Sequence, residues 1–387
     1  MICVRQLFCF TCLILMISVM SSCAMLTSWQ NQKPIRFRAA MTYLADDLLE
    51  DIRIDQLLHP KGEMVRIVIE PFSDAHTGDV PRVSRDIEAM LIALGKKAFI
   101  ITRMTSENLE RADYMIRGRI GLEPYKGGKT AAPEKYYHVT ASVVKTKTGK
   151  SVGHSSAWIA DKKPDMTPIS FYKDSPVYLK DSQDQDRTAI SAETAALLTE
   201  AETAYGKREY KKAIALLNRA LKRKDGPLIR IYGGLYSANR KLGRQDRAIA
   251  AFDKLLAVSV EKYNILTVKF LFNVNSVEFW NDPALREQYK IWLERIGVYF
   301  KTHRGCLQIL GHCSRSGTET YNKELSHERA VGIQARLRPY FPDVLRRSET
   351  VGRGFRETIV GTGTDDWRDA IDRRVEFHII DCKALSR

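Results

Sequence analysis

The chain has 387 residues, of which 44% are hydrophobic and 28% are charged. It is too long for one ordinary domain, and its composition excludes a disordered chain and a protein with several membrane spans. A formal net charge of +15 favours anionic partners such as lipid headgroups or wall polymers, although a solvated surface is an equal explanation. Basic residues form no long run, so we expect no nucleic-acid partner.

Residues 1–22 have the pattern of a signal peptide. Arg5 precedes an apolar run at 7–20, which is shorter than the roughly 20 apolar residues that a membrane span needs. Residues 20–23 (Met-Ser-Ser-Cys) resemble the bacterial lipobox, which implies that Cys23 carries acyl chains such as palmitate. Several acyl chains anchor a protein stably, so we expect a lipoprotein on the periplasmic face of the cell outer membrane. An ordinary secretory signal or a retained anchor helix is the alternative.

Residues 39–162 follow a linker at 23–38 and combine helical with strand patterns. We expect helices at 39–55 and 83–96, and strands at 64–69, 99–101, 112–120, 136–145 and 152–160. This order predicts an N-terminal α/β domain. The segments at 45–49, 65–72, 112–118 and 147–149 resemble the CsgG-like lipoprotein family, which implies an adaptor without catalytic residues.

Residues 163–190 are polar and contain Pro164, Pro168 and Pro176. Proline interrupts helices and strands, and clusters of polar residues with proline are typical of loops. We therefore expect this stretch to be an exposed linker between two domains.

Residues 191–262 are helical throughout and contain an internal repeat. The segment 212–221 aligns with 247–256 at an offset of about 35 residues, close to the 34 of a tetratricopeptide repeat. The resemblance to that family implies an all-α helical repeat pair with a groove for a partner protein of the cell envelope. A helical spacer is the alternative.

Residues 263–387 contain four strand patterns and two amphipathic helix patterns. The strands are expected at 268–276, 306–311, 349–354 and 374–380, and the helices at 283–300 and 320–337. The order β-α-β-α-β-β predicts an α+β domain with its helices packed on one sheet. The whole chain is therefore expected to be multidomain.

Five motifs of this last domain resemble the OmpA C-terminal family, which binds peptidoglycan. They occur in the family's order at 272–276, 311–318, 321–330, 352–354 and 372–376. The resemblance implies that the peptide stem of the wall is held near His312, Ser314, Asn322, Arg329, Asp372 and Arg373.

Two positions decide whether that site keeps its charges. Arg329 matches the family arginine, whose guanidinium takes a ligand carboxylate through two hydrogen bonds, although pairing with Glu328 on the helix surface is the alternative. Ser314 lies where the family has an aspartate, so a charge-assisted contact of about 1.5–3 kcal/mol becomes an ordinary hydrogen bond. Asp372, where the family usually has asparagine, is a candidate to restore the missing charge. Otherwise the domain keeps the fold as an interaction surface only.

The cysteines of this domain suggest a disulfide more than a metal site. His303, Cys306, His312 and Cys313 are residue types that bind metals. Cys306 and His312, however, lie at opposite ends of a strand of roughly 20 Å, so we expect no metal site. If the last strand runs antiparallel beside the second, Cys382 lies near Cys306 and an oxidising periplasm allows a disulfide. Small buried thiols are the alternative.

The chain has no nucleophile with a neighbouring base and no phosphate-binding loop, so we expect no enzyme and no cofactor. The leading hypothesis is a non-enzymatic outer-membrane lipoprotein that links the membrane at Cys23 to peptidoglycan. The alternative is an assembly or regulatory adaptor of a flagellar, secretion or wall-synthetic machine. Such an adaptor binds proteins through its helical repeats and its first domain, and it has lost its affinity for the wall.

Overall fold

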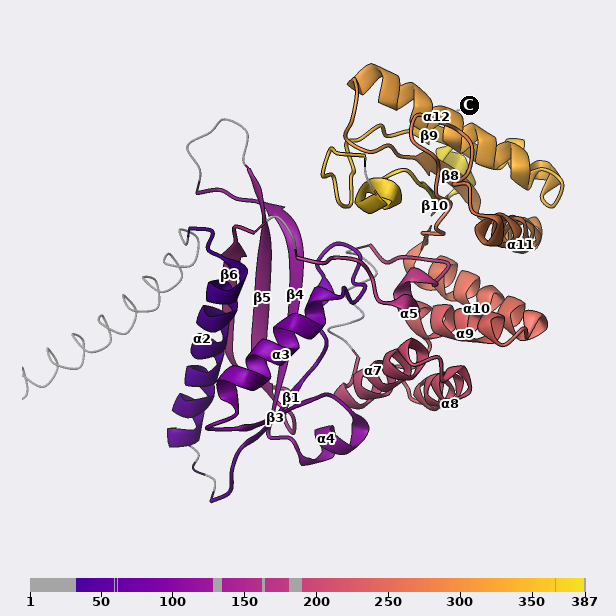
Figure 1. The fold of residues 1–387 in the computed structure, drawn as a ribbon. Helices are drawn as coiled ribbons and strands as arrows, with labels where there is room; N and C mark the ends of the chain where they lie inside the picture. Colours follow the sequence, from indigo (N-terminus) through magenta and orange to yellow (C-terminus); the bar gives the residue numbers. More distant parts are fainter. Residues whose placement is uncertain are drawn as a thin grey trace, which may run out of the picture.

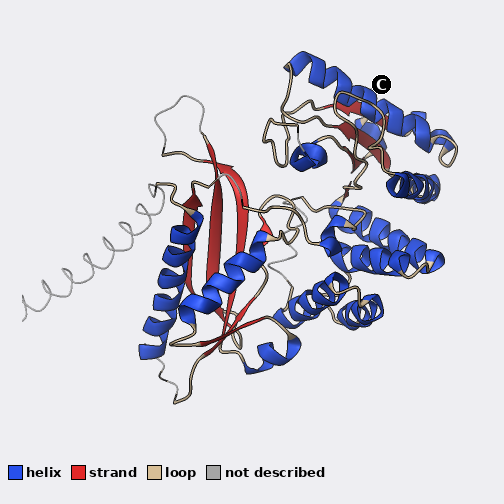
Figure 2. Ribbon diagram, in the orientation of Figure 1, coloured by secondary structure: helices blue, strands red, loops and turns tan. Residues whose placement is uncertain are grey.

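The computed structural model describes residues 33–58, 60, 62–127, 134–161, 164–180, 190–365 and 367–385. The predicted signal peptide, the lipidation site Cys23 and most of the linker at 23–38 lie outside these residues. Figures 1 and 2 show a mixed α/β chain with two sheets and a group of helices beside them. Within the described ranges, no helix combines the length and the apolar character that a membrane crossing requires.

The N-terminal part is one mixed sheet with long helices on one face (Figure 1). Its elements are α2 (Phe37–Leu58), β1 (Arg66–Ile69), β2 (Ser73–Asp74), α3 (Val83–Gly95), β3 (Ile100–Arg103), α4 (Ser106–Arg111), β4 (Tyr114–Pro124), β5 (Lys135–Lys145) and β6 (Ser151–Ile159). The strand order is β3-β1-β4-β5-β6, with β2 beside β4. Strand β1 is parallel to both neighbours, whereas β4, β5 and β6 form an antiparallel meander. The predicted helices and strands of this part are confirmed.

The burial pattern of each strand follows from its place in the sheet. In β1, Ile67 and Ile69 pack in the core under α2 and α3, while Val68 packs in a second core on the opposite face. A parallel strand covered on both faces needs such a continuous apolar run. In β5 burial alternates from Tyr137 to Val143, because one face alone meets the core.

The middle part consists of four helices that pack in sequence. They are α7 (Ala192–Gly206), α8 (Tyr210–Leu221), α9 (Ile229–Lys241) and α10 (Gln245–Tyr263). Helix α8 buries Ala213, Leu216, Leu217 and Ala220, which recur at the spacing of one helix face. Gly243, with a φ of +68°, makes the turn before α10. The all-helical prediction is confirmed for this stretch.

The C-terminal part has the predicted order β-α-β-α-β-β. Its elements are β7 (Ile265–Leu266), α11 (Pro283–Thr302), β8 (Cys306–Gly311), α12 (Glu319–Leu337), the 3-10 turn Pro342–Leu345, β9 (Ser348–Gly352), the 3-10 turn Trp367–Asp372, β10 (Val375–Ile380) and the 3-10 turn Cys382–Ala384. The sheet order is β7-β10-β8-β9, in which β8 and β9 are parallel and β10 is antiparallel to β7 and β8.

The first strand of this part differs from the prediction. A strand was expected at 268–276, but β7 ends at Leu266 and the chain continues in an irregular extended form. Its backbone groups pair outside the sheet, since the Lys269 N–H donates to the Pro176 carbonyl at 2.8 Å. Phe270 and Phe272 are nevertheless fully buried. Their apolar pattern reflected burial in the core, and that pattern alone does not specify a strand.

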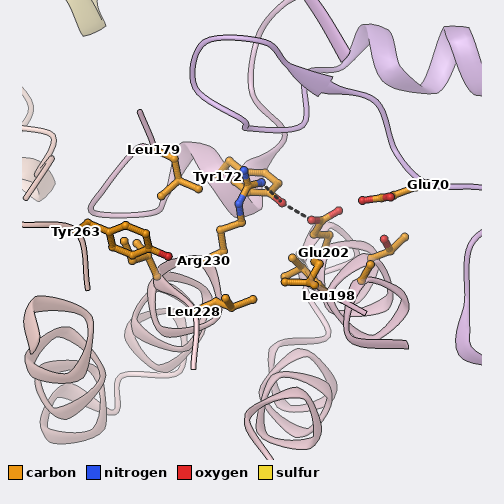
Figure 3. A pocket seen from close by; sticks show the side chains of 12 residues that line it. Glu70, Tyr172, Leu179, Leu198, Glu202, Leu228, Arg230 and Tyr263 are labelled. Atoms are coloured by element: carbon orange, nitrogen blue, oxygen red, sulfur yellow. Dashed lines mark hydrogen bonds between the residues drawn. The ribbon is translucent and has the colours of Figure 1, made fainter. Parts of the chain in front are cut away.

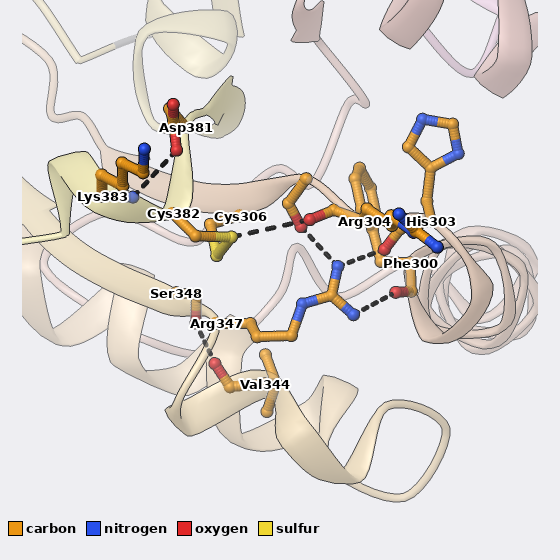
Figure 4. Close-up of a disulfide and its surroundings, with 11 residues drawn as sticks. Phe300, His303, Arg304, Cys306, Val344, Arg347, Ser348, Asp381, Cys382 and Lys383 are labelled. Carbon is orange, nitrogen blue, oxygen red and sulfur yellow. Dashed lines mark hydrogen bonds between the residues drawn. A yellow bond between two sulfur atoms is a disulfide. The ribbon is translucent and has the colours of Figure 1, made fainter.

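Cys306 and Cys382 form a disulfide, with their Cα atoms 5.0 Å apart (Figure 4). The pairing follows from the antiparallel contact between β8 and β10, which places Ile380 opposite Cys306. Of the two alternatives that the sequence left open, the disulfide is the one the structure shows. Cys313 is a free and buried thiol, and burial raises its pKa to about 11.

The expected exposed linker is wrong for residues 164–180, which we call the strap. Phe171, Tyr172, Val177, Tyr178 and Leu179 of the strap are all buried. The strap first pairs with the N-terminal part, then crosses α7 and α9 as the short helix α5 (Ser170–Lys173), and then pairs with the C-terminal part. Residues 163 and 181–189 of that predicted linker lie outside the described residues.

The strap helps to join the parts into one continuous core. That core extends from Val68 and Met115 of the first sheet, through the strap and the four helices, to Phe377 of the second sheet. Polar contacts reinforce it, since the Trp292 indole donates to the Tyr236 hydroxyl at 2.8 Å. The parts are therefore held by shared side-chain packing in addition to chain connectivity.

Candidate functional site

Arg329 lies on α12 and is buried between two loops. Its Nε donates to the Ser276 carbonyl at 2.9 Å, Nη1 to the His312 carbonyl at 3.0 Å and Nη2 to the Asn273 carbonyl at 3.0 Å. The guanidinium also lies over the Phe272 ring. Burial lowers the pKa of Arg329 from its usual range. The predicted ligand arginine therefore also fixes the loops of the site, and it does not pair with Glu328 on the helix surface.

Asp365 is the carboxylate that reaches Ser314. The hydroxyls of Ser314 and Ser316 both donate to Asp365, and Arg373 Nη1 lies 3.4 Å from Asp365 Oδ1. The side chain of Asp365 is 19% exposed, so it is partly accessible to solvent. A negative charge thus lies beside the position where the expected aspartate is replaced by Ser314.

Asp372, the predicted substitute for that charge, has a different role. Its two oxygens accept the backbone N–H groups of Ile359, Val360 and Gly361 at 2.5–3.0 Å, and the side chain is fully buried. Burial raises the pKa of Asp372, while these hydrogen bonds act in the opposite direction. Asp372 therefore shapes the loop before β10 and does not contact Ser314.

Asp369 anchors the same loop closer to Asp365. It accepts hydrogen bonds from the backbone N–H groups of Thr362, Thr364 and Asp365. Asp365 has a φ of +54°, a conformation that a non-glycine residue adopts only when its surroundings impose it. Two buried aspartates thus hold the loop in the shape that presents the Asp365 carboxylate.

Asn322 and Arg373 complete the frame around Asp365. Asn322 Nδ2 donates to the carbonyls of Ser316 and Thr318, which fixes the loop between β8 and α12. Arg373 is buried, and its Nε donates to the Phe272 carbonyl at 3.2 Å while Nη1 faces Asp365. Both predicted residues therefore lie at the same loop cluster as Ser314.

His312 lies on the other side of this cluster, in a buried charged network. Its ring is 3.8 Å from Glu376, and neither ring nitrogen has a hydrogen-bond partner among the residues that the structure describes. Glu376 also accepts from Tyr178 of the strap at 2.6 Å and pairs with Arg374 at 2.7 Å. Burial and the positive charge of Arg374 hold the pKa of His312 well below its ordinary value. His312 lies in the loop that also carries Ser314, but its ring lies beside Glu376 and does not contact Asp365.

The loop cluster combines one partly exposed acid with two buried guanidiniums. A partly exposed carboxylate accepts hydrogen bonds from a ligand ammonium. The two guanidiniums are each 1% exposed and already donate to backbone carbonyls, so they attract a ligand carboxylate only through their positive charge. The arrangement therefore suits a small zwitterionic group such as the end of an amino-acid side chain. We call Ser314, Ser316, Arg329, Asp365 and Arg373 the loop site.

The sequence motifs predicted every member of the loop site except Ser316 and Asp365. A signal for Asp365 was present, because the sequence at 361–366 (Gly-Thr-Gly-Thr-Asp-Asp) is glycine-rich and polar, which is typical of loops, and ends in two acids. Nothing local, however, indicates that this loop returns to Ser314 across 51 residues. No cluster of metal-ligand side chains occurs among the residues that the structure describes.

No protein-family model and no curated protein matches this chain. Among solved structures, the peptidoglycan-associated lipoprotein from Burkholderia pseudomallei is 25% identical over 29% of this chain and 88% of its own, with a TM-score of 0.25. The periplasmic domain of Helicobacter pylori MotB is 19% identical over 30% of this chain and 72% of its own, with a TM-score of 0.24. The C-terminal domain of LpoB from Salmonella enterica is 12% identical over 32% of this chain and 97% of its own, with a TM-score of 0.20.

These likenesses are partial, since none of the three extends over a third of this chain. The expectations of a CsgG-like domain and of tetratricopeptide repeats stay predictions.

Proposed function

We propose that the chain binds the peptide stem of peptidoglycan through the loop site and acts without catalysis as an attachment to the cell wall. The observation that carries this proposal is the Asp365 carboxylate beside Ser314 and Arg373. It supplies the negative charge that Ser314 lacks, so the cluster has both signs of charge for a zwitterionic ligand. Diaminopimelate, a common residue of the stem, carries an ammonium and a carboxylate on one carbon at its free end.

The buried arginines make this site rigid enough for recognition. Arg329 donates hydrogen bonds to three loop carbonyls. Arg373 donates to a fourth carbonyl and also faces Asp365. A preorganised site loses little entropy when the ligand arrives, which favours binding of a small group. The frame of hydrogen bonds thus supports a binding site and not only a packed surface.

Co-sedimentation with isolated sacculi tests the proposal. The full chain, purified in mild detergent, is mixed with diaminopimelate-containing peptidoglycan, and the bound fraction is measured with increasing free diaminopimelate. We expect saturable binding that the free amino acid reduces. Absence of binding at any wall concentration would overturn the proposal.

We further propose that acyl chains on Cys23 attach the protein to the outer membrane, so that it bridges membrane and wall. The support is the lipobox pattern at 20–23, and the assay is metabolic labelling with radioactive palmitate. The label should be incorporated into the chain and absent from a Cys23→Ser variant. Equal incorporation by both would contradict this anchor.

The adaptor function is the second candidate. It is favoured by the polar and aromatic surface with which α7 and α9 contact the strap, because such a surface suits recognition of a protein segment. The sacculus assay separates the two functions, since only attachment to the wall requires that the loop site bind peptidoglycan.

A further inference from the structure

The inner face of the four-helix part holds a segment of its own chain, the strap. Phe171 of the strap is 1% exposed, and its ring centroid lies 5.6 Å from that of Tyr205 on α7. On α9, a Cβ at Gly234 would overlap the Phe171 ring. Glycine at this position therefore leaves the space that the aromatic ring fills.

Tyr172, the next strap residue, is bound by charged side chains of two helices (Figure 3). Its hydroxyl donates to Glu202 of α7, and the guanidinium of Arg230 on α9 lies 5.7 Å from the centre of its ring. The contact with the Arg230 cation needs an aromatic ring, and the hydrogen bond to Glu202 needs a hydroxyl. The helices therefore distinguish tyrosine from a merely apolar residue at this position.

Asp174, two residues further on, is bound as an acid. The Tyr205 hydroxyl donates to its carboxylate at 2.7 Å, and Lys241 of α9 pairs with it at 2.9 Å. Ser237 also donates to the Asp174 carbonyl at 2.9 Å, so the backbone is held as well. Burial and the neighbouring Asp174 charge raise the pKa of Tyr205, which therefore remains a hydrogen-bond donor.

The strap fills its seat on the helices closely around Tyr172 and leaves open space beside Asp174. A cavity of only about 20 Å³ remains around Tyr172, Glu202 and Arg230. Next to the strap, a cleft of about 940 Å³ is lined by Lys173 and Asp174, by Lys241 of α9 and by other residues of all three parts. Ligand sites commonly enclose about 300–1,000 Å³, so a second chain segment has room to approach the strap.

We propose that α7 and α9 form a recognition site for a segment with two adjacent aromatic residues followed by an acid two positions later, and that the strap occupies this site in cis. The inferred partner is a segment of another protein that carries the same chemistry, adopts the same single helical turn and competes with the strap. Tethering gives the strap an effective concentration on the order of millimolar. A partner present at micromolar concentration therefore binds only if its affinity is higher or the strap is weakened.

A labelled synthetic peptide of residues 167–180 serves as the probe, and fluorescence anisotropy measures its binding to the full chain. The strap is weakened by the double variant Phe171→Ala, Asp174→Ala. We expect this variant to bind the peptide at least about tenfold more tightly than the native chain, whose own strap competes. A scrambled peptide, and a peptide that carries the same two substitutions, should not bind.

A glycine pair provides the matched control within the weakened-strap variant. Gly234→Ala should abolish binding of the peptide because its Cβ occupies the place of the aromatic ring. Gly206→Ala on α7, whose Cβ would meet only the end of the Arg85 side chain, should leave binding unchanged.

The proposal is overturned if the weakened-strap variant folds, as judged by circular dichroism, and does not bind the peptide. It is also overturned if Gly234→Ala and Gly206→Ala bind equally well. If the double variant does not fold, Asp174→Asn keeps the aromatic ring in place and removes the charge that Lys241 pairs with. This variant should still bind the peptide more tightly than the native chain, and equal binding would refute the proposal.

Discussion

Replacing Asp365 by asparagine removes one charge from the loop site and almost no volume. In the native chain this carboxylate accepts from Ser314 and Ser316 and faces Arg373 at 3.4 Å. A hydrogen bond to a charged group contributes about 1.5–3 kcal/mol, roughly twice a neutral one. Because Asp365 is partly exposed, the lower end applies, and we expect sacculus affinity to fall about tenfold.

The assay is co-sedimentation of the full chain with sacculi at a series of wall concentrations. Asp343→Asn is the matched control, because Asp343 lies on the same part of the chain and forms an exposed pair with Arg346 outside the loop site. It should bind the wall like the native chain. Equal affinity of Asp365→Asn and the native chain, with both folded, would refute the role assigned to Asp365.

Moving the charge provides a second test of the same reasoning. Ser314→Asp alone places two carboxylates in contact, and like charges at that distance oppose each other, so we expect no gain in binding. Ser314→Asp combined with Asp365→Asn restores a single carboxylate to the site. The double variant should bind the wall more tightly than Asp365→Asn alone, and a further loss would show that charge is not what the site requires.

Three further predictions concern stability. Arg329→Ala leaves loop carbonyls without their buried donor, so it should lower the free energy of unfolding by about 3 kcal/mol in urea titrations. A loss below roughly 1 kcal/mol would contradict the role of Arg329 in fixing the loops. Reduction of the Cys306–Cys382 disulfide, which closes a loop of 76 residues, should cost about 4 kcal/mol, and a paired serine variant should not respond to reductant. Burial and Arg374 depress the pKa of His312, so the unfolded chain takes up a proton below pH 6.5 that the folded chain does not. The free energy of unfolding should therefore fall as the pH drops below this value. His312→Gln should flatten this dependence of stability on pH between pH 7.5 and 5.5.

Much of the fold could be predicted because its signals are local. The spacing of apolar residues placed α2, α3 and the hairpin β5–β6 within a few residues of their observed bounds. The disulfide followed from one assumption about strand direction, which the pairing of β8 with β10 bears out. The expected strand at 268–276 was wrong because burial and strand pairing produce the same apolar pattern in a single sequence.

The candidate site could likewise be predicted only where its residues are close together in the sequence. Ser314, Asn322 and Arg329 lie within one loop and the helix after it, so their proximity was evident from their spacing. Asp365 joins them from 51 residues away, through a loop whose shape depends on Asp369. A contact of that kind depends on the tertiary fold and leaves no local signal.

By itself the sequence determined most of the longer helices and strands, the motif residues of the loop site and the lipobox pattern at 20–23, because these depend on residues that are neighbours in the chain. Only the tertiary structure decided which carboxylate reaches Ser314 and where the strap lies. A proline-containing polar stretch has the local character of an exposed linker. The strap is buried instead because Gly234 leaves room for Phe171 and because Lys241 pairs with Asp174, and both partners lie more than sixty residues away along the chain.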